Sequence, residues 1–143
     1  MTTTQGIYGL FQTNVDMEQQ GVVLNYGDNA AGQPVRVKIA RAGGSNARFA
    51  KALEARMRPY RRQFETGTLD DKVATAMLIE VFADSVILGW EGITDAAGNV
   101  LPYNRANVIK VLTDLPDLFS DIREQAMKSA NYRAEQTEAD SGN

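Results

Sequence analysis

The residues that could carry chemistry in this chain are carboxylates, amides, lysines and glycines, because its 143 residues include no histidine and no cysteine. That composition removes the commonest general base, the thiolate nucleophile and the usual ligands of zinc. An active site would have to use the remaining groups alone, and no pair of them stands out by its spacing. We therefore expect a protein that is not an enzyme and that holds no cofactor.

Two polar loops can be interpreted either as ligand sites or as structural turns. Asp95, Asn99 and Asn104 offer oxygen atoms, but their spacing does not match a calcium-binding loop, and we expect no metal. Gly43 and Gly44 precede a predicted helix, as phosphate-binding loops do. The further glycines, or the Lys-Ser/Thr pair, of such motifs are missing. The sequence favours a plain turn over a phosphate site there.

The longest apolar run spans residues 69–93 and contains the only tryptophan, Trp90. Asp70 and Asp71 at its start suit the positive end of a helix dipole, and apolar residues recur in it at helical spacing. Because the run is apolar on most sides, we expect a central core helix with Trp90 buried at its end. Acidic residues interrupt the run, and we expect no membrane span.

A β-hairpin is predicted before this helix, with strands at residues 21–25 and 35–40. In the second strand Val35, Val37 and Ile39 share one face, and basic residues occupy the other. A stretch of turn-forming residues joins the two strands. A hairpin alone is marginally stable, so its apolar face must dock on the helices or on another surface.

Three further helices are expected, at residues 46–64, 104–115 and 116–132. Pro59 should interrupt the first of them. The sequence thus predicts an α+β protein, mainly helical, with about four helices and an N-terminal hairpin. The chain is long enough for one domain with a real core. We divide it into a flexible N-terminal arm at residues 1–18, a globular domain at 19–133 and a disordered acidic tail at 134–143.

The N-terminal arm is apolar at its centre. A short strand, an arm packed on a neighbouring subunit and a frayed terminus all fit this pattern. Neither the arm nor the apolar face of the second strand has an evident partner of sufficient area within the chain. Our candidate partner-binding residues are therefore Ile7, Tyr8, Leu10, Phe11, Val35, Val37 and Ile39.

The basic residues are concentrated in one segment. Residues 36–62 hold nine basic residues and one acidic residue, a net charge of +8, whereas the whole chain carries −3. Such polarity favours head-to-tail contact between copies or an acidic partner, and we expect a homo-oligomer. The basic face of helix 46–64 fits nucleic acid, a solvated surface, or acids of a neighbouring subunit. Its aromatic residues follow the core stripe, so we do not expect nucleic-acid binding.

Two stretches carry recognisable motifs. Residues 37–49 read VKIARAGGSNARF and residues 86–104 read VILGWEGITDAAGNVLPYN, followed by LPDLFSDI at 115–122 and by Tyr132. The more specific elements are the Gly-Trp-x-Gly-Ile turn, the Asp-x-x-Gly and the Pro-Asp-Leu-Phe. Together they resemble the tail assembly chaperones of long-tailed, siphovirus-like bacteriophages, over about residues 35–133.

The resemblance implies a function. Such chaperones bind the long tape-measure protein, keep its apolar helices soluble and help the tail tube protein polymerise around it. The resemblance places the chain in the cytoplasm of an infected bacterium and outside the mature virion. The N-terminus lacks the features of a signal peptide, which fits that location. Many such chaperones also have a longer form made by a ribosomal slip, and the tail tube protein is the implied partner of that form.

Two other interpretations stay open. The chain could be a structural virion protein of the tail or neck, or a small nucleic-acid-binding protein that uses its basic helix. Mass spectrometry of purified particles separates a chaperone from a virion protein. Salt-dependent DNA binding would indicate the nucleic-acid interpretation.

Overall fold

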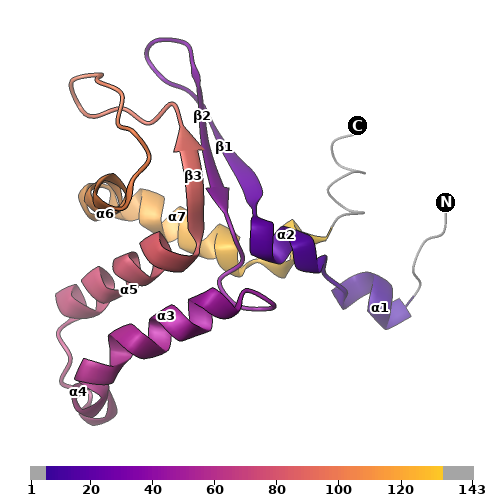
Figure 1. The fold of residues 1–143 in the computed structure, drawn as a ribbon, viewed down its shortest axis with the longest axis vertical. Coiled ribbons are helices and arrows are strands. Elements are labelled where there is room, and N and C mark those ends of the chain that lie inside the picture. The colour runs from indigo at the N-terminus through magenta and orange to yellow at the C-terminus, as the bar shows by residue number, and fades with distance from the viewer. Residues whose placement is uncertain (1–5, 134–143) are drawn as a thin grey trace.

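A three-stranded antiparallel sheet lies at the centre of the fold (Figure 1) in the computed structural model, which describes residues 6–133. Its strands, in spatial order, are β1 (Val22–Asp28), β2 (Pro34–Ile39) and β3 (Ile87–Glu91). The first two form the predicted hairpin. Leu24 of β1 and Trp90 of β3 both lie opposite Val37 of β2. Apolar residues of all three strands therefore share one face of the sheet.

The central helix is shorter than the sequence predicts. α5 (Asp71–Ser85) begins after Asp70, whose carboxylate accepts a hydrogen bond from the backbone N–H of Lys72 at 2.9 Å. The helix ends at Ser85, and the apolar residues that follow form β3 instead of continuing the helix to about Leu88, as the sequence predicts. The prediction is wrong because a buried strand and a buried helix give the same continuous apolar run. Gly89 disfavours a helix at this point, and β2 supplies hydrogen-bonding partners for a strand.

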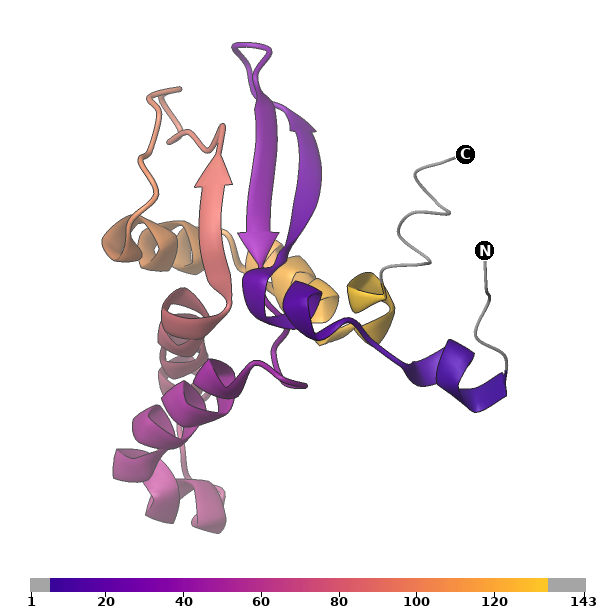
Figure 2. The same cartoon turned by 45° about the vertical axis from the view of Figure 1, so that its right-hand side comes forward.

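A pair of helices extends away from the sheet (Figures 1 and 2). α3 (Ala47–Met57) packs along α5, and a 3-10 turn (Arg58–Tyr60) that contains Pro59 separates it from α4 (Arg61–Thr66). The predicted interruption at Pro59 is confirmed. Neither Ser45 nor Asn46 caps α3 with its side chain. Asn46 is buried instead and donates from Nδ2 to the backbone oxygens of Arg41 and Ser85, at 2.9 Å each, which makes the Gly43-Gly44 loop a structural turn.

Two helices cover the inner face of the sheet from the C-terminal part of the chain. α6 (Arg105–Asp114) begins after Asn104, whose side chain accepts a hydrogen bond from the backbone N–H of Asn107 at 2.8 Å. α7 (Pro116–Met127) begins at Pro116, as the sequence predicts, and a 3-10 helix (Ser129–Tyr132) follows it. Figure 1 shows α7 behind the sheet.

The core lies between the inner face of the sheet and α5, α6 and α7. Phe82 of α5 is 1% exposed and stands at its centre. Its ring makes edge-to-face contacts with Phe49 of α3 and Phe119 of α7, with centroid distances of 5.9 Å and 5.3 Å. The three rings join the outer helix pair to the helices under the sheet.

Two short helices precede β1. α2 (Val15–Gln20) is fixed to the body, since the backbone N–H of Asn14 donates to the carbonyl oxygen of Tyr132 at 2.7 Å. Glu18 of α2 is 3% exposed; it pairs with Arg41 and accepts a hydrogen bond from Ser45 Oγ at 2.8 Å. α1 (Gly6–Phe11) extends away from this anchored part (Figures 1 and 2).

The α+β class is confirmed. Among the described residues, four α-helices have ten residues or more and three have six, beside the three-stranded sheet. The differences from the prediction are the third strand and the two helices before β1. The tail predicted at residues 134–143 lies outside the described residues.

Candidate functional site

The four N-terminal candidate residues lie on α1, which forms a helix and not the short strand considered above. Ile7, Tyr8, Leu10 and Phe11 are 69%, 70%, 62% and 67% exposed, respectively. Ile7, Leu10 and Phe11 follow helical i, i+3, i+4 spacing and therefore share a face. No residue of α1 is buried. We call the surface that these three residues and the neighbouring Tyr8 form the α1 face.

The three candidate residues of β2 have a different environment. Val37 and Ile39 are 1% and 0% exposed and belong to the core, and Val35 is partly buried against it. The expectation that this strand face lacks a partner within the chain is wrong. Because β3 adds apolar surface to the sheet and three helices pack on it, Val37 and Ile39 do not reach the surface of the folded domain.

An apolar cleft of about 560 Å³ opens at the hairpin end of the sheet. Segments far apart in the sequence form it: the ends of β1 and β2, the loop at residues 92–101, and the junction of α6 with α7. Its apolar lining includes Tyr26, Val35, Ile93, Leu101, Leu115 and Leu118. We call it the α6–α7 cleft. Leu115 is 52% exposed, so the apolar lining is open to solvent at that side.

The motifs that resemble phage chaperones meet at this cleft. Gly92 and Ile93 come from the Gly-Trp-x-Gly-Ile turn, and Asp95 begins the Asp-x-x-Gly. Leu115 and Leu118 belong to the LPDLF stretch. The sequence alone did not predict the cleft, and its only signal was the presence of these motifs in two separated segments.

Polar groups that line the cleft already have partners. The Tyr26 hydroxyl donates to Asp121 Oδ2 at 2.6 Å, and burial together with this carboxylate raises the pKa of Tyr26. Lys110 Nζ lies 2.7 Å from Asp114 Oδ2. Hydrogen bonds from the backbone N–H groups of Asn99 and Ala97, at 2.9 Å each, lower the pKa of Asp95. The arrangement contains no base poised beside a nucleophile, and it offers binding of an apolar group.

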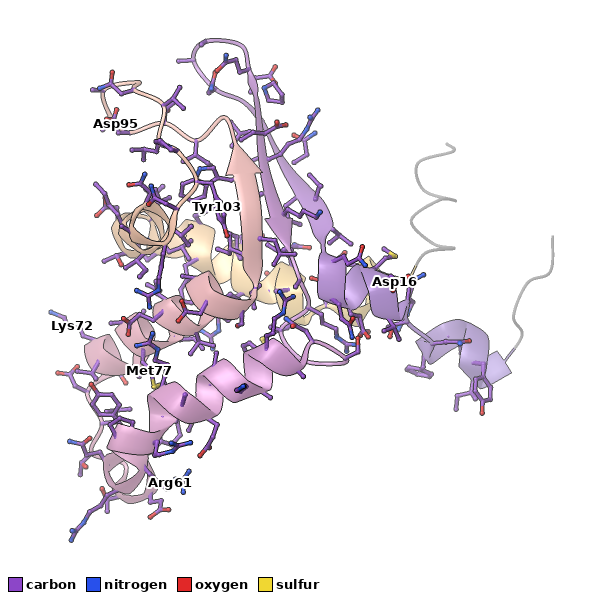
Figure 3. All side chains as sticks on the ribbon, viewed as in Figure 1. Asp16, Arg61, Lys72, Met77, Asp95 and Tyr103 are labelled. Atoms are coloured by element: carbon purple, nitrogen blue, oxygen red, sulfur yellow. The ribbon has the colours of Figure 1, made fainter. Side chains whose placement is uncertain are left out.

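Trp90 fixes the loop that borders the cleft. The sequence predicts a largely buried Trp90 at the end of a helix, whereas the residue lies in the strand β3 and is partly buried. Its indole Nε1–H donates to the carbonyl oxygen of Leu101 at 2.9 Å, and its ring contacts Tyr103 edge to face with a centroid distance of 5.9 Å. Figure 3 labels Asp95 in this loop and Tyr103 near β3. Trp90 therefore positions the cleft loop from the adjacent strand.

Acidic groups of the same chain balance part of the basic segment. Asp84 accepts hydrogen bonds from Arg105 Nε at 2.7 Å and from Arg56 Nη2 at 3.0 Å, and these two arginines lower its pKa. Arg36 lies 2.8 Å from Glu91 across the outer face of the sheet. The local charge is therefore smaller than the +8 of the sequence segment suggests, which weakens the argument for a charge-driven contact.

Within residues 6–133, no group of three or more acidic side chains is placed to hold a metal ion. No helix in the same range is both long and apolar enough to cross a membrane.

The comparisons with known proteins give a family. The family model of the YdaY prophage protein matches residues 44–143, and the chain belongs to this family. It is therefore a phage-derived protein. No curated protein and no solved structure matches the chain.

Proposed function

We propose that this chain is a non-enzymatic tail assembly chaperone of a long-tailed phage, which binds the tape-measure protein and promotes tail tube assembly. The observation that carries the proposal is the α1 face, with four large apolar side chains at least 62% exposed. A soluble domain rarely keeps such a surface on a projecting helix unless another protein covers it. A long helical client with exposed apolar stripes is a partner of matching chemistry.

Three further observations support the proposal. The motifs that resemble tail assembly chaperones converge on the α6–α7 cleft, and the chain belongs to a prophage family. The polar groups that line the cleft are internally paired, which suits an apolar ligand better than a charged one. The proposal includes a site of action in the host cytoplasm, absence from the mature virion, and a longer form that recruits the tail tube protein.

Coexpression with the tape-measure protein of the same prophage tests the proposal. The chain should raise the amount of tape-measure protein in the soluble fraction. Leu10→Asp combined with Phe11→Asp should reduce this effect without unfolding the domain, because both side chains are largely exposed. Phe64→Asp on α4, where the side chain is 52% exposed, is the matched control and should behave as the wild type. A tape-measure protein that is equally insoluble with and without the chain would exclude the chaperone role.

The alternative is a structural protein of the tail or neck, which would cover the same apolar helix within the particle. Mass spectrometry of purified virions separates the two roles. A chaperone should be missing from the particles, whereas a structural protein should be present at a fixed copy number.

A further inference from the structure

We propose that the α1 face of one copy inserts into the α6–α7 cleft of a second copy, so that the chain assembles head to tail. The contact would be made by Ile7, Leu10 and Phe11, with Tyr8 at its margin, on one side and by apolar lining residues such as Leu115 and Leu118 on the other. The inference goes beyond the proposed function, because it gives the α1 face a second occupant beside the client, and its test contains no client protein.

The first argument is that α1 needs a partner. A helix of six residues is not stable by itself in water, so a contact must maintain it. Tyr8 and Phe11 each carry on the order of 200 Å² of surface, and the four exposed apolar side chains together offer roughly 500 Å². The lining of the cleft offers less surface than this, so the contact falls below the roughly 1,000 Å² of a stable interface. The association is therefore weak and should depend on protein concentration.

The second argument is that α1 is kept away from the cleft of its own chain. Asn14 is fixed to Tyr132, so only residues 12–14 connect α1 to the body, and three residues span at most about 10 Å. The cleft lies at the other end of β1, a strand of seven residues, about 23 Å long. Figure 3 accordingly labels Asp95 of the cleft and Asp16 of α2 on opposite sides of the molecule. An α1 that enters the cleft must therefore belong to another copy.

The third argument is chemical fit. An apolar helix that binds a groove uses anchors at i, i+3 and i+4, which is the spacing of Ile7, Leu10 and Phe11. The cleft volume of about 560 Å³ is typical of a site that encloses a few such side chains. Residues 1–15 carry no charged side chain. Insertion of α1 would therefore bury no unpaired charge against the partnered Lys110 and Asp114.

This contact joins two different surfaces, so it does not close after two copies. A copy whose α1 is inserted still has an open cleft, and the assembly grows into a ring or a filament. A symmetric contact between two α1 helices would instead stop at a dimer. The two geometries therefore predict different behaviour of mixed variants.

Sedimentation velocity of the purified chain, without any client, tests the inference. The wild type should form species larger than a dimer as its concentration rises. The double variant Leu10→Asp/Phe11→Asp, which keeps its cleft, should be a monomer, and so should Leu115→Asp, which keeps its α1. An equimolar mixture of these two variants should form a 1:1 dimer and nothing larger, because one working α1 and one working cleft remain. Phe64→Asp should assemble as the wild type does.

Three results would overturn the inference: a monomeric wild type, a mixture that stays monomeric, or Leu115→Asp that associates as the wild type does. The last result would indicate pairing between α1 helices. Circular dichroism must show that each variant is folded. If Leu115→Asp unfolds, Ala96→Trp takes its place, because Ala96 lies on the exposed loop and a larger side chain there fills the cleft.

Discussion

Replacing Arg41 by leucine tests how the N-terminal helices are held on the domain. The change leaves the carboxylate of Glu18, which is 3% exposed, without its charged partner. Removing one partner of a buried ion pair costs about 3–5 kcal/mol. The Arg41 side chain is 23% exposed, and Ser45 Oγ still donates to Glu18 at 2.8 Å. We therefore expect a smaller loss of unfolding free energy, about 2–3 kcal/mol at pH 7.

The loss should depend on pH in a defined direction. Burial raises the pKa of Glu18, but hydrogen bonds from Arg41 and Ser45 outweigh it and leave the pKa below the ordinary value of 4.5. A lowered pKa contributes stability above the unfolded-state value, and this stability is lost as the pH falls through the folded-state pKa. Arg41 is the first of the hydrogen-bond partners that lower this pKa, so the variant loses part of the stability that ionised Glu18 contributes. The difference between wild type and variant should shrink below about pH 5.

Urea unfolding followed by the fluorescence of Trp90, the single tryptophan, measures this difference. Arg36→Leu is the control, since it breaks the exposed pair with Glu91, in which the side chains are 47% and 54% exposed. Its cost should be about 0–1 kcal/mol. The reasoning is refuted if Arg41→Leu costs less than about 1 kcal/mol at pH 7, or if its cost is the same at every pH.

Three other results are expected. Trp90→Ala should lower the unfolding free energy by about 2–3 kcal/mol, which is less than the cost for a fully buried tryptophan. Urea unfolding followed by circular dichroism measures this loss, and no measurable loss would mean that Trp90 does not hold the cleft loop. Gly92→Ala should cost about 1–3 kcal/mol by the same assay, because Gly92 has φ +76° and an added Cβ would collide with the backbone of Pro34. An unchanged stability would show that the loop adapts. Association of the chain should persist from about 0.1 M to about 1 M salt, because the α1 face is uncharged and several arginines pair within the chain. Dissociation at high salt, measured by sedimentation, would instead support the charge-driven contact predicted from the sequence.

The parts of the fold that follow local rules could be predicted from the sequence. Strict alternation of Val35, Val37 and Ile39 predicts β2, the carboxylates at Asp70 and Asp71 predict the start of α5, and Pro59 predicts the break after α3. Each of these signals acts within a few residues of the element it determines, so no knowledge of the tertiary structure is needed.

The strand β3 could not be predicted in the same way. Its residues extend the apolar run of α5, and only the pairing of Ile87 with Ile39 and of Trp90 with Val37 makes them a strand. That pairing joins residues about fifty positions apart, and hydrophobic periodicity carries no information on it. The same omission led to the expectation that the β2 face is unpartnered.

The α6–α7 cleft and the buried pair of Glu18 with Arg41 were missed for a related reason. The cleft needs Val35, Ile93 and Leu115 to meet in space, and each of them lies near the end of a different element. The sequence places Glu18 in an N-terminal arm, where an acidic residue is expected to be exposed. In the structure the turn that carries Arg41 and Ser45 buries it. The sequence indicates an apolar N-terminal arm, but a helix was not among the conformations that its pattern suggested for these residues.

Direct binding to the tape-measure protein is the most decisive measurement for the proposed role. The tape-measure protein of the same prophage, carrying an affinity tag, is coexpressed with this chain, and the copies of the chain that co-purify are quantified by mass spectrometry. We expect several copies per soluble tape-measure molecule, with a loss of binding in Leu10→Asp/Phe11→Asp and retention in Phe64→Asp. A tape-measure protein that is recovered in soluble form without this chain bound would contradict the account.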